Sequence, residues 1–371
     1  MPNMIYADHA ATTFLSPAAL DAMMPYMTGV FGNPSSIHSY GEEAAAAVAK
    51  ARSTIAEVLN CLPEEIIFTS GGSEADNHAI AIIASHAKAG DTLLISDAEH
   101  HAVMNPVKAL TRRRIKVNTL SSKGGEVIAE QIFDAARDNR SICGGSFMYE
   151  TTETGSIFDI RRIAYAIHER GGYMHTDAVQ AVGHIPVDFA ALGVDMLSLS
   201  AHKFHGPKGV GALICRKGIE IPSFIKGGSQ ESGRRAGTEN VAGIVGMAAA
   251  LSKSAKNLKI NMDSVQDLRN LLLRGLIPLG AEENFSGAPG ILSVRFKNGD
   301  GEALVRSLDL FGIAASAGAA CNSKEVGVSH VLLSMGLTAE EAASTVRFSL
   351  DASNTKEEIA KIIAVMTELL G

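Results

Sequence analysis

Ser200-Ala201-His202-Lys203-Phe204-His205-Gly206-Pro207-Lys208-Gly209 is the stretch that decides the fold prediction. An apolar run, residues 194–199, precedes it, and a run of that length bounded by Gly and Pro predicts a buried strand. Lys203 then lies just past the carboxyl end of that strand, where open α/β sheets bind their ligands. A partly desolvated amine beside His202 has the chemistry of a nucleophile toward a carbonyl, although a lone loop lysine is more often simply solvated.

The composition describes an ordinary globular protein. The chain has 371 residues, 46% of them hydrophobic, which predicts two or three domains. Its net charge of −7 argues against nucleic acid or an anionic membrane as the main partner. Because the sequence shows neither a signal-peptide pattern nor a run long enough to span a bilayer, we expect a cytoplasmic protein. The four scattered cysteines form no C-x-x-C pair, so neither a disulfide framework nor a zinc site is predicted.

Strand and helix patterns alternate over the first two thirds of the chain. Strands alternating with helices of this length predict an α/β fold with a mostly parallel sheet covered on both faces. The expected strands are residues 65–69, 92–96, 115–119, 141–148, 172–177, 194–200 and 210–215, and the expected helices are 42–60, 73–88, 160–170 and 239–254, with others opening near 99 and 127.

The pattern changes after the helix that is expected to end near Ser254. Shorter strands (291–296 and 345–350) and a terminal amphipathic helix (355–370) indicate a small α+β unit. We therefore expect a large domain of residues 15–255 and a small domain made of residues 1–14 and 256–371.

A glycine turn follows the first strand of the expected sheet. Ser70-Gly71-Gly72-Ser73 connects that strand to a helix, an arrangement that offers backbone N–H groups and a helix dipole to a phosphate. Gly72 allows close backbone approach, and Ser73 adds a hydroxyl donor. The alternative is a plain strand-to-helix turn with Ser73 as the N-cap.

Several polar side chains fall at strand ends or helix starts of this one sheet. They are Ser73, His100, Asp177, Gln180, Ser200, His202 and Lys203. A phosphate cradle, a stacking imidazole, a carboxylate and an amine are what pyridoxal phosphate requires. The lysine holds its aldehyde as a Schiff base, and the carboxylate keeps the pyridine nitrogen protonated. The set predicts a pyridoxal phosphate site.

The motifs of this chain resemble those of the group I cysteine desulfurases (NifS/IscS type) in the class V aminotransferase family. The resemblance runs over nearly the full length. It rests on the motifs at residues 8–13 (DHAATT), 32–36 (GNPSS), 68–74 (FTSGGSE), 175–180 (HTDAVQ), 200–203 (SAHK), 234–240 (RRAGTEN), 316–321 (SAGAAC), 329–332 (SHVL) and 346–350 (VRFSL). It implies a fold-type I architecture, with a mostly parallel seven-stranded sheet and a smaller α+β domain.

The resemblance also implies how the cofactor is bound. Lys203 would form the Schiff base, Asp177 would pair with the pyridine nitrogen, and Gln180 would bind the phenolic oxygen. His100 would stack on the ring and serve in acid–base steps. The phosphate would be held by Gly72, Ser73, Ser200 and His202, and by Thr238 from a second subunit of a homodimer.

The substrate site follows from the same resemblance. Asn33 and Arg347 would bind the substrate carboxylate, a task that suits a planar guanidinium. Cys321 would be the sulfur nucleophile. It lies in a run of Ala, Gly, Ser and Asn, which predicts an exposed loop, and nearby Lys324 favours the thiolate. Cys143 and Cys215 fall inside strand patterns and are interpreted as buried small hydrophobes.

One motif departs from the family pattern. Where the family carries Asn-Asn-Glu-x-Gly, this chain has Thr151-Thr152-Glu153-Thr154-Gly155. Thr152 takes the place of an Asn that binds the phenolic oxygen, and threonine has no amide N–H₂ to offer. The loss of one such bond costs about 1 kcal/mol, which leaves Gln180 as the main partner.

These observations lead to one hypothesis and its rivals. We expect a homodimeric, pyridoxal phosphate-dependent desulfurase that converts L-cysteine to L-alanine. Its persulfide on Cys321 would pass to an acceptor protein for iron–sulfur cluster or thio-cofactor synthesis. The rivals are a selenocysteine lyase or another class V lyase or transaminase, and a weakly active cofactor-binding scaffold suggested by Thr152.

Overall fold

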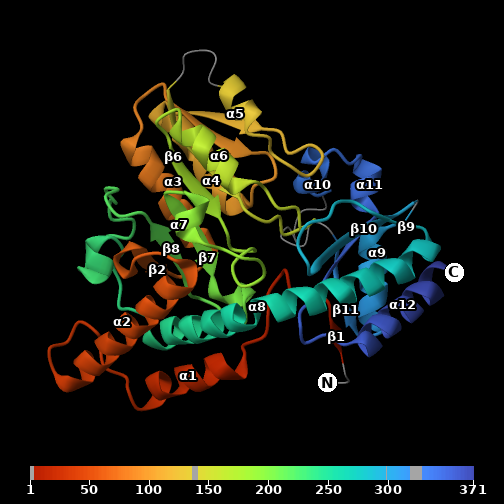
Figure 1. Ribbon diagram of the computed structural model, residues 1–371, viewed down its shortest axis with the longest axis horizontal. Helices are drawn as coiled ribbons and strands as arrows, with labels where there is room; N and C mark the ends of the chain where they lie inside the picture. The colour runs from red at the N-terminus through yellow and green to blue at the C-terminus, as the bar shows by residue number, and fades with distance from the viewer. Residues whose placement is uncertain (1–3, 136–140, 298, 318–327) are drawn as a thin grey trace.

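The computed structural model describes residues 4–135, 141–297, 299–317 and 328–371 (Figure 1). Its centre is a seven-stranded sheet in the order β2-β8-β7-β6-β5-β3-β4. The pairs from β7 to β4 are parallel, and β8 is antiparallel to both of its neighbours. The strands are β2 (Ile66–Thr69), β3 (Thr92–Ser96), β4 (Lys116–Leu120), β5 (Ile142–Met148), β6 (Tyr173–Asp177), β7 (Met196–Ser200) and β8 (Gly211–Cys215).

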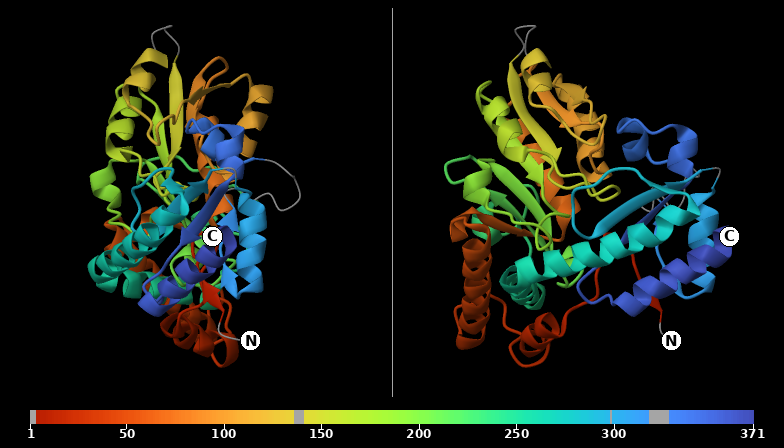
Figure 2. Two further views of the ribbon diagram at one scale, coloured as in Figure 1. Left: turned by 90° about the vertical axis from the view of Figure 1, so that its right-hand side faces the viewer. Right: turned by 45° about the vertical axis from the view of Figure 1, so that its right-hand side comes forward.

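The sheet is buried on both faces because its strands are apolar on both. In β3, Leu94 packs into one core with Phe147, whereas Leu93 and Ile95 pack into the other. Alternate side chains of a strand point to opposite faces, so each face requires its own cover. Figure 2 shows helices on both sides of this sheet. The covering helices include α3 (Gly72–His86) and α4 (His101–Leu110) on one face, and α5 (Glu130–Ala135), α6 (Ile160–His168) and α7 (Phe189–Leu192) on the other.

The longest helix joins the two parts of the molecule. Helix α8 (Val241–Leu276) is 36 residues long and crosses Figure 1 from one side to the other. The prediction that this helix ends near Ser254 is wrong. Residues 254–261 contain no Gly or Pro, so the backbone meets no helix breaker there. The side chains of its first half pack into the large core and those from Val265 onward into a second core. The predicted domain division at residue 255 stays a prediction.

The second core lies between a small antiparallel sheet and its helices. The sheet has the order β12-β13-β10-β9, and β1 pairs in parallel with β11 beside it. Its elements are β9 (Ala281–Glu283), β10 (Ile291–Phe296), β12 (Ser316–Ala317) and β13 (Thr345–Ser349), with β1 (Ile5–Tyr6), β11 (Ile313–Ala314), α9 (Gly301–Leu310), α10 (His330–Ser334), α11 (Ala339–Ala343) and α12 (Lys356–Leu370). The N-terminal segment is therefore brought beside elements some 300 residues later in the chain.

Two further helices complete the large half. Helix α1 (Pro17–Thr28), which the sequence analysis left unassigned, and α2 (Ser39–Leu59) pack against the first half of α8. The predicted mostly parallel α/β sheet is confirmed, with strand ends within two residues of those expected. Within the described residues, none of the helices is both long and apolar enough to cross a bilayer.

Candidate active site

Lys203 lies at the carboxyl end of the central sheet. Strand β7 ends at Ser200, and a short 3₁₀ turn, η3 (Ala201–Lys203), follows it directly. The Lys203 ammonium donates to the backbone carbonyl of Ala10, and also to that of Ala11 at 3.3 Å. The amine therefore lies between the sheet and the segment that follows β1. The position predicted for Lys203, just past a strand end, is confirmed.

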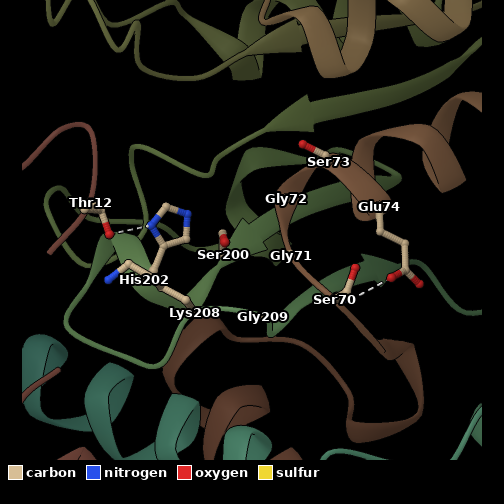
Figure 3. A pocket seen from close by; sticks show the side chains of 10 residues that line it. All are labelled: Thr12, Ser70, Gly71, Gly72, Ser73, Glu74, Ser200, His202, Lys208 and Gly209. Carbon is tan, nitrogen blue, oxygen red and sulfur yellow. Dashed lines mark hydrogen bonds between the residues drawn. The ribbon is translucent and has the colours of Figure 1, made fainter. Parts of the chain in front are cut away.

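A hollow beside Lys203 has the donor groups of a phosphate site. Figure 3 shows it between the start of α3 and the end of β7. Gly71, the N-cap of α3, has φ of +154°, a conformation that glycine adopts most readily. A Cβ on Gly72 would lie 2.6 Å from Val179 Cγ2, so both positions require glycine. The hollow is lined by Thr12, Ser70, Gly71, Gly72, Ser73, Glu74, Ser200, His202, Lys208 and Gly209.

The charges around this hollow favour an anion. His202 Nδ1 lies 3.1 Å from Thr12 Oγ1, and burial, together with Lys203 and Lys208, lowers the pKa of His202 to about 4. His202 is therefore a neutral partner at pH 7, and Lys208 brings a positive charge. Glu74 is neutralised by Arg235, whose Nε lies 2.8 Å from its carboxylate. The helix dipole of α3 adds to the attraction.

Three polar side chains, of which Asp177 and Gln180 are buried and His100 is half-buried, face the same sheet edge. Asp177 ends β6 and accepts a hydrogen bond from the Val179 N–H at 2.9 Å. Burial raises the pKa of Asp177, whereas His100 and Lys203 act in the opposite direction. His100 caps α4 by accepting from the Ala102 N–H at 3.1 Å, and burial lowers its pKa. Gln180 is buried, and its Oε1 has no hydrogen-bond partner among the described residues.

Arg347 is a buried cation held by two partners. It lies on β13 with its side chain 2% exposed, and its Nη2 is 2.7 Å from Asp8 Oδ1. Its Nη1 donates to the Thr152 carbonyl at 3.0 Å. The remaining donor, Nε, is buried and has no partner within the described part of the chain. A guanidinium with one open N–H in a closed setting is suited to bind a substrate carboxylate.

Glu153, the residue after Thr152, is half-buried and interacts electrostatically with Arg347. Ser329, the N-cap of α10, donates to the Glu153 carboxylate. Burial raises the pKa of Glu153 to about 7, while Ser329 and Arg347 lower it. The Thr152–Glu153 segment thus holds both Arg347 and the start of α10.

The structure brings most of the predicted site residues to one place. Gly72, Ser73, Ser200 and His202 line the hollow directly. Asn33 and Thr238 do not; they line a separate hollow near α1 together with Tyr26, Val30, Phe31, Gly32, Pro34, Glu239, Asn240, Val241 and Ala242. Cys321 lies outside the described residues. Cys143 and Cys215 are buried as interpreted, and burial raises the pKa of each thiol to about 12.

Four side chains near the site were not predicted to act there. Thr12 and Lys208 line the phosphate-type hollow, Asp8 holds Arg347, and Asp76 lies in α3 behind Asp177. Three of them belong to motifs that can be recognised in the sequence. Asp8 and Thr12 belong to the Asp8–Thr13 motif and Lys208 to the turn after Lys203, but these patterns assign them no role.

Comparison with known proteins places the chain in a family. The sequence model of the family described as Aminotransferase class-V matches residues 5–362. A protein of Clostridium botulinum (strain Hall) named cysteine desulfurase IscS is 40% identical over 380 residues, covering 100% of this chain and 95% of the relative. A solved structure described as a NifS-like protein has 34% identity and a TM-score of 0.93, with 99% of both chains covered. A second, described as SspA in complex with cysteine, has 31% identity and a TM-score of 0.83, covering 95% of this chain and all of that one.

The fold and site define a class V aminotransferase-type protein, in which a lysine follows a strand of a mostly parallel sheet beside an anion-binding helix start. The chain belongs to the aminotransferase class-V family, and within it, its relatives are the cysteine desulfurases of the NifS/IscS type.

Proposed function

We propose that this chain is a pyridoxal phosphate-dependent cysteine desulfurase that releases L-alanine from L-cysteine. The observation that carries the proposal is the position of Lys203. Its amine follows Ser200 and His202, which line the phosphate-type hollow, and it interacts electrostatically with the buried Asp177. Full-length similarity to proteins named cysteine desulfurase supports the same reaction.

The residues present fit the cofactor. The N-terminus of α3, Ser200 and Lys208 offer donors and positive charge to a phosphate, and Gly71, which has no Cβ, leaves its backbone open to the hollow. Gln180 is buried at the same sheet edge, and its Nε2 amide would donate a hydrogen bond to the phenolic oxygen. When bound, pyridoxal phosphate supplies an aldehyde and an electron-accepting ring.

Side chains of the protein would bind the substrate and transfer protons. Arg347, with its open Nε, would bind the cysteine carboxylate and thereby orient the substrate. His100 is uncharged at neutral pH because burial lowers its pKa, so its Nε2 is available to hold or pass a proton. The ionised Asp177 would accept a hydrogen bond from the protonated ring nitrogen, and the Lys203 amine would accept the substrate's α-proton.

The sulfur step is proposed for Cys321, on the basis of family resemblance. The Cys321 thiolate would attack the sulfur of the bound cysteine, forming an S–S bond as the substrate's carbon–sulfur bond breaks. The electrons of the broken bond remain with the substrate carbon, which takes up a proton and leaves as alanine. Cys321 then carries a persulfide. The structure described as SspA in complex with cysteine supports cysteine as the substrate.

The proposal is tested by absorbance and product analysis. The purified protein with pyridoxal phosphate should show a band near the visible edge that is lost in Lys203→Ala. L-cysteine with a reductant should yield equal amounts of alanine and sulfide. Cys321→Ala should keep the band and lose sulfur release. If Cys321→Ala releases sulfide at the normal rate, the assignment of the nucleophile is wrong.

Thr152 motivates the rival of a weakly active scaffold. Thr152→Asn would supply an amide toward the phenolic oxygen, so a shifted absorbance band with faster turnover would show that the threonine limits activity. An unchanged spectrum and rate would count against the scaffold. A selenocysteine lyase is distinguished by turnover of selenocysteine that does not depend on Cys321.

We further propose a homodimer that passes its sulfur to an acceptor protein in the cytoplasm. Support for the dimer comes from exposed apolar side chains in the α1–α2 connection, where Phe31 is 73% and Ile37 is 96% exposed. Phe31 lines the same hollow as Thr238. Sedimentation velocity tests the dimer, because Ile37→Glu should shift the protein toward monomer.

A further inference from the structure

Asp76 is a buried carboxyl group to which the proposed reaction assigns no role. It lies in the second turn of α3 and is 1% exposed. Its Oδ1 is 3.7 Å from His175 Nε2 on β6 and has no hydrogen-bond partner among the described residues. Its carboxyl group interacts with the side chains of Ser198 and Asp177. Asp76 therefore lies next to the carboxylate that is proposed to face the cofactor.

The neighbouring histidine does not neutralise this carboxyl. His175 is fully buried, with Nδ1 2.8 Å from Ser146 Oγ and Nε2 2.9 Å from Ser198 Oγ. Burial lowers the pKa of His175 to about 3, so the imidazole is neutral. It orients the Ser198 hydroxyl but contributes no positive charge to Asp76.

Asp76 and Asp177 form a carboxyl pair that cannot be doubly ionised without a large penalty. Both are buried and interact with each other, and like charges in a buried pair disfavour ionisation of the second group. Glu99 is a third buried carboxyl, and it adds little charge at neutral pH because burial raises its own pKa to about 8. One proton therefore remains on the pair.

The surroundings decide which carboxyl keeps that proton. Asp177 accepts from the Val179 N–H and is stabilised as an anion by the charge of Lys203. Burial and the negative charge of Asp177 raise the pKa of Asp76 well above the ordinary value. Asp76 is the protonated member and Asp177 the ionised one.

We propose that Asp76 is a positioning residue that donates its carboxylic proton to Asp177, and so holds Asp177 ionised and oriented toward the ring nitrogen of the cofactor. This inference rests on the proposed pyridoxal phosphate site. A donated hydrogen bond makes Asp177 a weaker base, so the proton between Asp177 and the ring stays on the ring. Without Asp76, that proton moves toward Asp177 and the ring loses positive charge.

The test compares Asp76→Ala with Asp76→Asn in protein loaded with pyridoxal phosphate. The asparagine amide can still donate to Asp177, whereas alanine cannot. Asp76→Ala should weaken equilibrium binding of pyridoxal phosphate by about tenfold, the effect of losing one hydrogen bond to a charged group. It should also raise the midpoint pH of the visible absorbance titration, because a less positive ring disfavours loss of the adjacent proton. Asp76→Asn should restore both values.

A control separates positioning from general damage. Asp195 is another buried carboxylate, which accepts from the Met174 N–H at 2.7 Å at the opposite end of β6. Asp195→Ala should lower stability and leave the titration midpoint unchanged. If Asp76→Ala behaves in the same way, Asp76 is merely structural and the inference is wrong.

Two further measurements keep the inference testable if Asp76→Ala does not fold. The infrared difference spectrum of wild type minus Asp76→Asn at neutral pH should contain a protonated-carboxyl band, and its absence would show that Asp76 is ionised. A visible absorbance titration whose midpoint lies at lower pH in Asp76→Asn than in wild type would also show that Asp76 is ionised in the wild-type protein. If the unaltered protein does not bind pyridoxal phosphate, the inference and the proposed function both fail. If it binds the cofactor but does not act on cysteine, only the proposed function fails.

Discussion

Replacing Asp8 by alanine should destabilise the protein strongly because Arg347 cannot reach water. The Arg347 side chain is 2% exposed, that of Asp8 is 18% exposed, and their charged atoms are 2.7 Å apart. Removing one partner of a buried pair leaves an uncompensated charge, which costs about 3–5 kcal/mol. The partial exposure of Asp8 points to the lower end, so we expect a loss of about 3 kcal/mol.

The assay is urea unfolding at one fixed protein concentration, with Arg347→Met and the double variant beside Asp8→Ala. Arg347→Met removes the buried guanidinium charge that Asp8→Ala leaves unpaired. The double variant should therefore be more stable than Asp8→Ala alone, although it carries one more substitution. This non-additivity is the signature of a buried pair. Asp8→Ala should also raise KM for cysteine, since Arg347 loses the contact that orients it.

The reasoning is refuted if Asp8→Ala lies within about 0.5 kcal/mol of wild type, the range of an ordinary surface change. It is also refuted if the double variant is no more stable than Asp8→Ala. Either result would mean that Arg347 is hydrated or that the Thr152 carbonyl alone satisfies it.

Three other substitutions test separate features of the structure. Burial raises the pKa of Glu99 from 4.5 to about 8, so its stabilising effect is complete below pH 4.5 and is lost as the pH rises through about 8. Glu99→Gln should therefore lose less unfolding free energy than wild type between about pH 5 and pH 8. Glu231 is buried and pairs with Arg52 at 2.7 Å; Glu231→Ala should cost about 3 kcal/mol in urea unfolding, more than Glu231→Gln. Lys208→Gln should weaken pyridoxal phosphate binding by roughly 1 kcal/mol, about fivefold, and make it less sensitive to salt, as fluorescence titration would show.

The central sheet could be predicted because its signals are local. Each buried strand is an apolar run of a few residues bounded by turn residues, and each is followed by a helical pattern. Lys203 and the glycine turn before α3 lie next to such strand ends in the chain. The predicted strand ends therefore also predicted where these residues lie in the fold. Parallel strands place their carboxyl ends at one edge, which is why residues from several strands could be expected to converge.

The end of α8 could not be predicted in the same way. The predicted change of domain near residue 255 led us to end the helix there, but the backbone contains no breaking residue at that point. Side chains on one helix can pack into two cores without any break in its hydrogen bonds, and only the arrangement of the two cores shows this.

The sequence by itself determined the alternating α/β architecture, the strand-end lysine and the residue types that suit a pyridoxal phosphate site. Only the tertiary structure decided which side chains meet. Asp8 and Arg347 are 339 residues apart, and Asp76 contacts Asp177 across a helix–sheet interface. Such contacts have no local pattern, because they depend on how whole elements pack. Burial at these contacts decides which groups stay ionised, since only the packed protein removes them from water.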